Sequence, residues 1–398
     1  MTEHNGRTSE PILDPDLEIV DSHHHLFDRP TGRYMFEDYL ADASAGHNIV
    51  ASVYVETQAM ARTYGPAQLR AIGEVEFANG VAAMSDSGGY GPCRVSAAIV
   101  GYADLTVGEP AGEFLDLALS TAPERFRGVR QILIDHPSEA PYRYITHRPP
   151  SGLIRRPGLV SGLRELGKRE LTFDAAVLHH QLPELSRLAD SVPETTMILN
   201  HLGLAIAMET NAEESTAIFR SWRDSLHDLA RRPNVVCKIG GLGLPFWGFG
   251  LESRETKPGS DELAEIWRPY VETAVEAFGA DRCMMESNFP PDARSCGFVP
   301  LWNALKSVTE AFSASERTAL FSRTARRVYR IPSVGQADVR GPRGRGPGAS
   351  ARPDAVTVQA NAAATASAAA NAALSSSSFT GVGQDDSFTT TTPRSMSM

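Results

Sequence analysis

Two histidines separated by one residue, His23 and His25, are the strongest chemical signal in the sequence. They directly follow the apolar run Leu17–Asp21 in the segment LEIVDSHHH. Side chains alternate between the two faces of a strand, so His23 and His25 share one face and His24 points to the other. Two imidazoles on one face at the end of a strand can bind one metal ion. The spacing therefore predicts a metal site, with a solvent-exposed histidine run as the alternative.

Histidines also follow two further apolar runs. His179 and His180 come after the run Leu171–Val177, and His201 follows the run Thr196–Leu199. Taken alone, each is equally typical of a histidine at the start of a helix. Together with the first pair, they predict that three histidine clusters meet where the carboxyl ends of parallel strands lie.

A fourth polar cluster ends the apolar run Arg282–Met285, in the segment ESNFPPD. Glu286 and Asn288 share one face of a strand. A hydrolase built on histidines needs a carboxylate here, either to hold a metal ion or to accept a proton from the attacking water. Asn288 offers an amide oxygen and hydrogen bonds but is not a base at neutral pH. Glu286 or Asp292 is therefore predicted to supply the negative charge.

Charged residues at other strand ends complete the candidate site. Glu56, Arg130 and Lys238 each stand at the end of an apolar run. A cation near a group of histidines suits a substrate carboxylate or a developing oxyanion, and a structural ion pair between Arg130 and Glu56 is the alternative. Asp21 and Asp174 are predicted to support the histidines from behind.

Short β-rich runs that alternate with helix-length stretches must position these groups. Several intervening stretches have apolar residues at i, i+3 and i+4 spacing, as in Leu163–Leu166. Strands that alternate with helices predict an α/β fold, a (β/α)8 TIM barrel, while the pattern alone leaves a doubly wound sheet open. The predicted strands are Leu17–Asp21, Ile49–Val55, Val95–Val100, Val129–Ile134, Leu171–Val177, Thr196–Leu199, Val235–Ile239 and Arg282–Met285.

The chain is long enough for such a barrel and has an unusual carboxyl-terminal part. Its 398 residues exceed the typical barrel length of about 250 residues. After Ile331-Pro332 the sequence has Gly-Arg repeats, an Ala-rich stretch, SSSS and TTTT, a composition that cannot bury a core. We therefore expect a loose leader over residues 1–16, the barrel domain over 17–332 and a disordered tail over 333–398.

Charge and composition exclude several other classes of protein. Lys and Arg number 38 against 48 Asp and Glu, and this net charge of −10 without a basic stripe predicts no nucleic-acid partner. No apolar run reaches the roughly 20 residues of a spanning helix, and the first residues lack a signal-peptide core, so we expect no membrane partner. Four widely spaced cysteines without a CxxC fit a reducing compartment, so we expect a cytoplasmic protein. Trp222, Trp247, Trp267 and Trp302 fit either core packing or a homodimer interface.

These residues and motifs resemble the amidohydrolase-related TIM-barrel hydrolases of the amidohydrolase superfamily. The resemblance is to the branch of the sugar-lactone and sulfomuconolactone hydrolases and, more distantly, to pyrone-dicarboxylate lactonase. It extends from about Asp21 to Tyr329. The phrases that carry it, in order, include VDSHHHLFD, GEVEFANGVAAMS, RFRGVR, HHQLPEL, LNHLG, PNVVCKIGGLG, RPYVETAVEAFG, DRCMMESNFP and FSRTARRVYRI.

The resemblance implies roles for the histidines. His23 and His25 match the HxH of the family, and His201 matches the histidine of its HxG, so these three are the implied metal ligands. His179 matches the histidine before QLPEL, and it is implied to be catalytic together with His201.

The strand-eight residues depart from the pattern of many family members. Asn288 stands where many of them have Asp, although the ESNFP form recurs in this branch. Asn288, at this family position, and Glu286, from the residue pattern, are predicted to be catalytic. The implied cofactor is a divalent metal ion, zinc with manganese as the alternative, and related lactonases also include metal-free forms.

The main functional hypothesis is a hydrolase that opens a lactone or similar ester-like bond in a small acidic metabolite. Glu56, Arg130 and Lys238 are predicted to bind this carboxylated substrate. A non-oxidative decarboxylase of an aromatic or unsaturated carboxylic acid is the alternative, and Asn288 counts against it because related decarboxylases typically have Asp there. A barrel without chemistry, whose tail recruits partners, is the third hypothesis, which the histidines at the strand ends oppose.

Overall fold

The computed structural model of the protein describes residues 10–333. The predicted disordered tail, apart from Ser333, lies outside the described residues, and so do residues 1–9 of the predicted leader. Within the described range, no helix combines the length and the apolar character that a membrane crossing requires.

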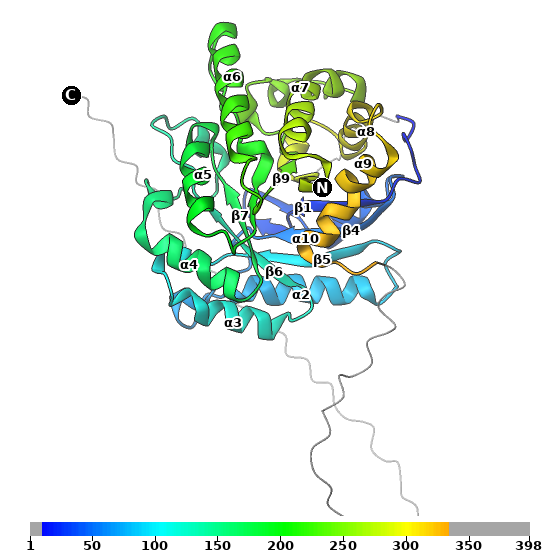
Figure 1. Ribbon diagram of the computed structural model, residues 1–398. Coiled ribbons are helices and arrows are strands. Elements are labelled where there is room, and N and C mark those ends of the chain that lie inside the picture. Colours follow the sequence, from blue (N-terminus) through cyan, green and yellow to red (C-terminus); the bar gives the residue numbers. More distant parts are fainter. Residues whose placement is uncertain (1–9, 334–398) are drawn as a thin grey trace, which may run out of the picture. The chain divides into compact units, whose positions relative to one another are not determined.

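Eight parallel strands form the barrel, and each is hydrogen bonded to the next in sequence order (Figure 1). They are β1 (Ile19–His24), β4 (Ile49–Val55), β5 (Arg94–Gly101), β6 (Phe126–Ile132), β7 (Thr172–Ala176), β8 (Met197–Leu199), β9 (Val235–Ile239) and β10 (Cys283–Met285). A parallel bridge between His24 and Phe289 nearly closes the ring between β1 and β10. The predicted TIM barrel is confirmed, and the doubly wound sheet is excluded because the strand order follows the sequence.

Helices cover the outside of the barrel. Figure 1 shows α2 and α3 along one side of the strands and α5, α6 and α7 along others. The helices are α1 (Phe36–Ala43), α2 (Ile72–Asp86), α3 (Ala111–Thr121), α4 (Pro157–Lys168), α5 (Leu182–Ser191), α6 (Ala212–Leu229), α7 (Ser260–Phe278), α8 (Phe298–Val308), α9 (Ala314–Thr318) and α10 (Thr324–Tyr329). In α4 the apolar spacing works as predicted, because Leu159, Leu163 and Leu166 are fully buried on one face.

Apolar side chains fill the amino-terminal end of the barrel. Tyr329 of α10 and Ile331 pack in one buried cluster with Val20, Ile198 and Val236 of the strands. The cluster closes this end of the barrel, so reactive groups at the opposite, carboxyl-terminal ends of the strands face the available space.

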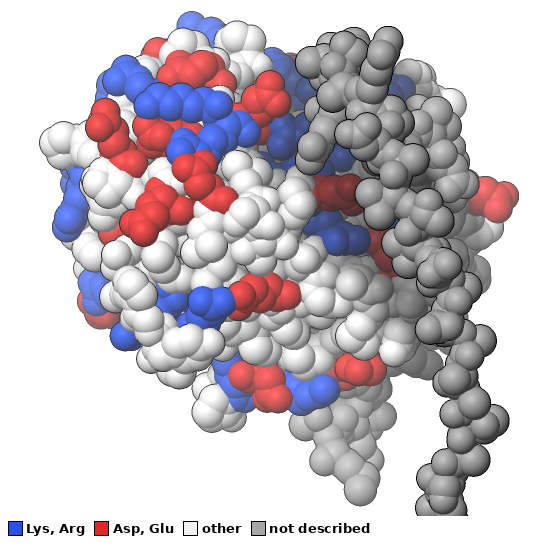
Figure 2. Space-filling view, turned by 90° about the horizontal axis from the view of Figure 1, so that it is seen from below, with Lys and Arg blue, Asp and Glu red and all other residues white. Residues whose placement is uncertain are grey.

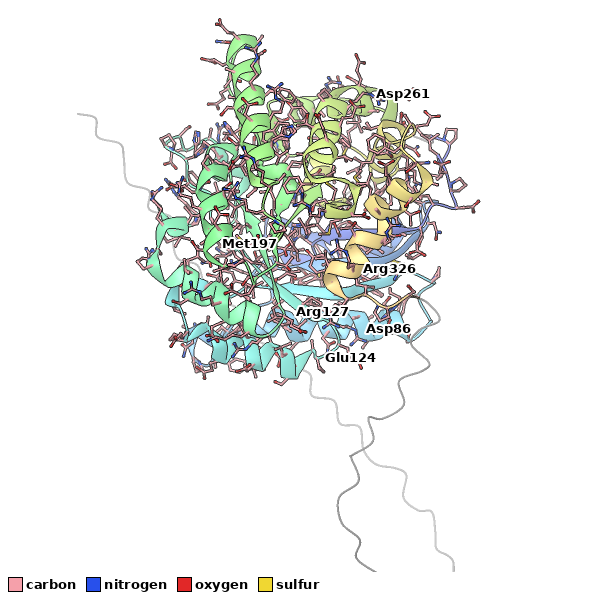
Figure 3. The ribbon with its side chains drawn as sticks, viewed as in Figure 1. Asp86, Glu124, Arg127, Met197, Asp261 and Arg326 are labelled. Atoms are coloured by element: carbon pink, nitrogen blue, oxygen red, sulfur yellow. The ribbon has the colours of Figure 1, made fainter. Side chains whose placement is uncertain are left out.

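Most charged side chains away from the strand ends lie on the outside. Asp86, at the end of α2, forms an ion pair with Arg125. Figure 3 places Asp86, Glu124 and Arg127 along the edge formed by α2 and α3. Met197 of β8 is fully buried. On the face that Figure 2 shows, Lys and Arg alternate with Asp and Glu. This face therefore has the mixed charge of an ordinary globular domain.

The four tryptophans lie in the core. Trp222, Trp247, Trp267 and Trp302 are each at most 2 % exposed. Core packing accounts for them, so they provide no support for the predicted homodimer interface.

A short hairpin follows β1 and was not predicted. Its strands are β2 (Phe27–Arg29) and β3 (Gly32–Tyr34), paired antiparallel across the turn at Pro30-Thr31. The hairpin stands at the carboxyl-terminal end of β1, where it contributes to the wall of the candidate site.

The described part of the leader is attached to α8. Asn303 Nδ2 donates to the carbonyl of Pro11 at 2.9 Å, and Lys306 Nζ donates to the carbonyls of Leu13 and Asp14 at 2.8 Å each. These hydrogen bonds hold residues that we expected to be loose.

Candidate active site and metal centre

β1 ends in the predicted pair of histidines on one face. His23 Nε2 and His25 Nε2 lie 3.2 Å apart, and their rings meet edge-on. His24 points the other way, where its Nε2 lies 3.0 Å from Ser52 Oγ and its ring stacks on Tyr39. The alternation of side chains along the strand thus brings His23 and His25 together.

His201, after β8, joins this pair. Its ring centroid lies 4.7 Å from that of His23, and its Nδ1 lies 2.5 Å from Glu286 Oε1. The backbone here is in the left-handed region, with φ of 50° at His201 and 59° at Leu202. Such conformations cost about 1–3 kcal/mol per non-glycine residue and cluster at functional sites. The chain therefore carries strain at the residue that presents this imidazole.

Two glycines after β9 make room for His201 and its partner. A Cβ on Gly241, which has a φ of +62°, would lie 2.5 Å from His201 Nδ1. A Cβ on Gly240 would lie 2.3 Å from Glu286 Cγ. The two glycines of the segment Ile239-Gly240-Gly241 are therefore the sequence feature that could have predicted the contact between His201 and Glu286.

Glu286, after β10, contacts two histidines at once. Besides the contact with His201, its Oε2 lies 3.0 Å from His23 Nδ1. The Glu286 side chain is 0 % exposed. It is therefore positioned to orient two imidazoles, and its predicted catalytic role stays a prediction.

Burial keeps the first two histidines neutral. Desolvation, followed by the charges of Lys238 and other neighbours, lowers the pKa of His23 well below its ordinary value. Desolvation and the charge of Arg130 lower the pKa of His25 in the same way. Neutral imidazole is the form that binds a metal ion.

Lys238 lies beneath the histidines inside the barrel. Its Nζ donates to Asp174 Oδ2 at 2.8 Å and lies 3.3 Å from His23 Nδ1. Asp174 Oδ2 also accepts from Tyr329 Oη at 3.0 Å and from Asn200 Nδ2 at 3.1 Å. Lys238 is 0 % exposed, is paired with Asp174 and is not among the residues that line the cavity, so its position does not support the predicted role in substrate binding. Asp174 has its predicted supporting place.

Arg130 and Glu56 form the ion pair that we considered as an alternative. Arg130 Nε donates to Glu56 Oε1 at 2.7 Å, and its Nη2 donates to the Glu56 carbonyl at 2.5 Å. Arg130 Nη1 lies 3.4 Å from His23 Nε2. One edge of the guanidinium is therefore held by Glu56, and Nη1 remains directed toward the histidines.

Asn288 and Asp292 form a second buried pair. Asn288 Nδ2 donates to Asp292 Oδ1 at 2.7 Å, so the amide oxygen of Asn288 is the group left for the cavity. Asp292 is fully buried and also accepts from the Gly243 amide. Desolvation raises the pKa of Asp292 well above its ordinary value, which favours the protonated acid. Glu286, and not Asp292, is the carboxylate in contact with the histidines.

Asp21 connects β1 to β10. Its carboxylate accepts from the backbone amide and Oγ of Ser287 at 2.8 and 2.6 Å and from Tyr39 Oη at 2.9 Å. Burial raises its pKa to about 6 despite these donors. Asp21 thus supports the strand that carries the histidines, as predicted for it.

His179 is not brought to the other histidines. Its Nδ1 accepts from the Ile206 amide at 3.2 Å. It lines a separate cavity of about 370 Å³ together with His136 and His180. We therefore leave His179 out of the candidate active site, contrary to the role that the sequence predicted.

A cavity of about 940 Å³ lies over the strand ends. Its polar lining includes His25, His201, Glu56, Arg130 and Asn288. Its apolar walls include Phe27, Ile132, Tyr144, Phe246 and Phe289. This combination of size, apolar walls and convergent polar groups is typical of a small-molecule site.

His23, His201 and Glu286 form a candidate site for a divalent metal ion, and His25 adjoins His23. Ligand atoms of His23, His201 and Glu286 all lie within 4.8 Å of one another. His25 Nδ1 lies 2.9 Å from the Val55 carbonyl, and Nδ1 of the other two faces Glu286, so the Nε2 atoms are directed away from these acceptors. His23 Nε2 also has Arg130 Nη1 at 3.4 Å. Metal–nitrogen bonds of about 2.0–2.1 Å place two ligand nitrogens of one ion roughly 3.0–3.4 Å apart. The 3.2 Å between the Nε2 atoms of His23 and His25 matches this spacing.

The charges around the histidines also favour a cation. Glu56, Asp174 and Glu286 bring three carboxylates, whereas Arg130 and Lys238 bring two cations. With His23 and His25 neutral, these five groups leave one carboxylate without a counter-ion. A metal ion or a proton on this cluster would balance it.

The comparisons place the chain in a family. The sequence model of the Amidohydrolase family matches residues 20–331, and the chain belongs to this family. It is 33 % identical over 338 residues to the "Uncharacterized protein y4mH" of Sinorhizobium fredii, covering 79 % of this chain and 99 % of that protein. It is 28 % identical over 243 residues to an L-fucono-1,5-lactonase of Burkholderia multivorans, covering 61 % of this chain and 74 % of that protein.

Solved structures share the fold. An amidohydrolase from Burkholderia multivorans, solved with bound zinc, superposes with a TM-score of 0.57 at 24 % identity and covers 79 % of this chain and 99 % of its own. A putative 2-pyrone-4,6-dicarboxylic acid hydrolase from Pseudomonas putida superposes with a TM-score of 0.55 at 17 % identity, covering 80 % of this chain and 99 % of its own. These similarities confirm the barrel.

Proposed function

We propose that this member of the Amidohydrolase family hydrolyses a lactone, or a similar ester-like ring bond, in a small molecule. The observation that carries the proposal is the cluster of His23, His25 and His201 at the floor of a cavity of small-molecule size. The similarity to L-fucono-1,5-lactonase supports a lactone as the bond that is opened.

His23 and His25 would hold a divalent ion, with zinc favoured by the nitrogen ligands and manganese as the alternative. Such an ion would polarise the substrate carbonyl and lower the pKa of a water. His201 is the third candidate ligand, but its firm contact with Glu286 also suits proton transfer, and we assign it that role. The Glu286 carboxylate accepts the Nδ1 proton of His201 and so leaves Nε2 as the basic atom that faces the cavity.

Arg130 and Asn288 act on the substrate itself. Arg130 Nη1, with the rest of its guanidinium fixed by Glu56, is a donor for the carbonyl oxygen as negative charge develops on it. Asn288 offers its amide oxygen to a hydroxyl or a water at the end of β10, which lies across the barrel from β6, the strand of Arg130. The four cysteines are buried free thiols, which supports the cytoplasm as the compartment.

Metal content separates the two roles that we assign to the histidines. We expect near one equivalent of zinc or manganese by mass spectrometry in the purified protein and none in the His23→Ala/His25→Ala double variant. His201→Ala should keep its metal but lose turnover. Loss of the metal from His201→Ala would instead make it a ligand, and a folded wild type that takes up no metal would leave a metal-free lactonase.

A panel of substrates tests the reaction. We expect ring opening of lactones, measured as acid release at constant pH, and no carbon dioxide from aromatic or unsaturated carboxylic acids. Carbon dioxide release without ring opening would replace the hydrolase by the decarboxylase that Asn288 disfavours. No turnover on either panel together with no bound metal would favour the scaffold hypothesis.

A further inference from the structure

The cavity over the histidines has an excess of positive charge, although the whole chain carries a net charge of −10. Five of the side chains that line it are Arg or Lys and three are Asp or Glu. The cations are Arg29, Arg33, Arg130, Lys257 and Arg294, and the carboxylates are Glu10, Asp42 and Glu56. The lining therefore differs in sign from the protein as a whole.

The three carboxylates are occupied by donors of the protein. Glu56 pairs with Arg130, and Tyr34 Oη donates to Asp42 at 2.6 Å. Glu10 accepts from the Ser260 amide at 2.9 Å. They are therefore poorly available to neutralise the remaining cations.

Arg29 and Lys257 have only neutral partners among the described residues. Arg29 Nη1 donates to Thr146 Oγ1 at 2.8 Å, and its Nη2 donates to the carbonyl of Thr57. Lys257 Nζ donates to the carbonyl of Ala293 at 2.6 Å. Both cations are half-buried, where a charge without a counter-ion is unfavourable. Binding of an anion beside either cation would therefore be favourable.

These two cations belong to segments that adjoin the reacting groups. Thr57, which holds Arg29, directly follows Glu56, the partner of Arg130. Ala293, which holds Lys257, follows Asn288 in the loop after β10. Thr57 follows β4 and Ala293 follows β10, the two strands that adjoin β1, so Arg29 and Lys257 both reach the same cavity beside the end of β1.

We propose that Arg29 and Lys257 form a subsite for a substrate carboxylate that is separate from the carbonyl under attack. The inference rests on the proposed function and deepens it, because it makes the substrate a lactone with a carboxylate substituent and not a neutral sugar lactone. It also replaces Lys238, the buried lysine to which the sequence had assigned this task. Arg33 does not take part, because it is paired with Asp38 at 3.1 Å.

Equilibrium binding tests the subsite without any turnover. The probes are tetrahydropyran-2-carboxylate, which lacks the lactone carbonyl, and the matching carboxamide, and the measurement is titration calorimetry. We expect the carboxylate to bind about ten- to hundred-fold more tightly than the carboxamide, as a hydrogen-bonded charge does. Arg29→Met and Lys257→Met should each remove most of this preference, and added salt should weaken it.

Arg33→Met is the matched control, since it removes a cation from the same lining that already has a carboxylate partner. Its preference for the carboxylate should stay within about twofold of wild type, as expected for an exposed ion pair. Equal affinity for the two probes, or an unchanged preference in both Arg29→Met and Lys257→Met, would overturn the subsite.

Turnover distinguishes failure of the subsite from failure of the proposed function. Wild type is tested on a δ-lactone with a carboxylate substituent and on the corresponding carboxamide. Hydrolysis of both at equal kcat/KM would remove the subsite and keep the lactonase. Selective binding of the carboxylate probe without hydrolysis of any lactone would keep the subsite and remove the lactonase.

Discussion

His23 is the side chain on which the candidate site converges. Its Nε2 faces His25, and its Nδ1 faces both Glu286 Oε2 at 3.0 Å and Lys238 Nζ at 3.3 Å. A carboxylate at Nδ1 favours the tautomer with its proton there, which leaves Nε2 free to bind a metal. An ammonium group at Nδ1 favours the opposite tautomer. The Asp174 carboxylate accepts a hydrogen bond from Lys238 and so weakens the effect of the ammonium charge on the tautomer of His23.

The buried ion pair predicts a large effect of substitution. Lys238→Met should lower the free energy of unfolding by about 3–5 kcal/mol, because it leaves Asp174 buried without its cation. The double variant Lys238→Met/Asp174→Leu should recover much of this loss. Urea unfolding followed by circular dichroism provides the measurement.

An exposed pair provides the control for this series. Arg254→Met removes an ion pair with Glu262 on the surface and should change stability by about 1 kcal/mol or less. A Lys238→Met variant as stable as Arg254→Met would contradict the account of the buried pair.

At the residue scale, the sequence predicted the histidines better than their partners. The spacing of His23 and His25 is local, so the alternation of a strand was enough to place them together. The contact between Lys238 and His23 joins residues 215 positions apart, and that between Tyr329 and Asp174 joins residues 155 apart. Such contacts depend on the closure of the barrel, and for this reason the pairing of Lys238 with Asp174 was not predicted.

At the scale of elements, the site depends on two irregular segments that follow strands. His201 has a positive φ, and Gly241 in the segment after the neighbouring strand leaves space for its ring. The two segments must therefore fit each other before His201 can face Glu286.

Substitution of the glycine should damage activity more than stability. In Gly241→Ala the new Cβ would displace the His201 ring, and a displacement of about 1 Å can cost roughly 100-fold in rate. Gly250→Ala is the control, because Gly250 has a φ of +67° but open space around the position of a Cβ. Both variants should lose some stability from the strained φ, and Gly241→Ala should lose about 1–3 kcal/mol more because its Cβ meets the His201 ring. Thermal unfolding measures both losses, and kcat is compared at a temperature at which both variants are folded. Equal kcat in the two variants would show that the contact with His201 is unimportant.

The elements that the sequence predicted are those with continuous apolar runs. β4 and β9 have the boundaries that were expected, because buried strands of a parallel sheet consist of β-branched and other apolar residues. The hairpin of β2 and β3 was missed because each strand has three residues and is partly exposed. That hairpin carries Arg29, so the proposed carboxylate subsite also escaped sequence analysis.

At the scale of the whole molecule, the described leader, α8 and the loop before β4 are joined through His47 and Lys306. Lys306 Nζ lies 3.0 Å from His47 Nδ1, and His47 Nε2 donates to the Val299 carbonyl at 3.2 Å. Neutral His47 thus uses both ring nitrogens, and Lys306 also holds the carbonyls of Leu13 and Asp14. Protonation of His47 would remove the acceptor and place two cations together.

This linkage predicts a pH dependence of stability. Burial and the charge of Lys306 lower the pKa of His47 to about 4 from its ordinary 6.5. The stabilisation is therefore present above about pH 6.5 and is lost as the pH falls toward 4, by up to about 3 kcal/mol. His47→Gln should lose less unfolding free energy than wild type between pH 6.5 and pH 4, measured by urea unfolding at each pH. His147→Gln, at an exposed histidine, should lose unfolding free energy with falling pH as wild type does. A pH profile of His47→Gln that equals that of wild type would contradict the linkage.

The barrel itself was the most predictable feature of the whole molecule. Alternating strands and helices indicated it, and the order of the strands confirmed it. The closure of its amino-terminal end by Tyr329 and Ile331 was not predicted, because an apolar residue in the last helix gives no sign of the strands that it will contact.

The activity of His25→Ala tests the central claim most directly. His25 lines the cavity and lies against His23 Nε2, but the ring makes one hydrogen bond to the backbone, at Val55. We predict that His25→Ala keeps its fold by circular dichroism and loses at least about 100-fold in kcat/KM for a carboxylated δ-lactone, as expected when a residue that would hold the ion that polarises the carbonyl is removed. A folded His25→Ala protein that hydrolyses this lactone at the wild-type rate would contradict it.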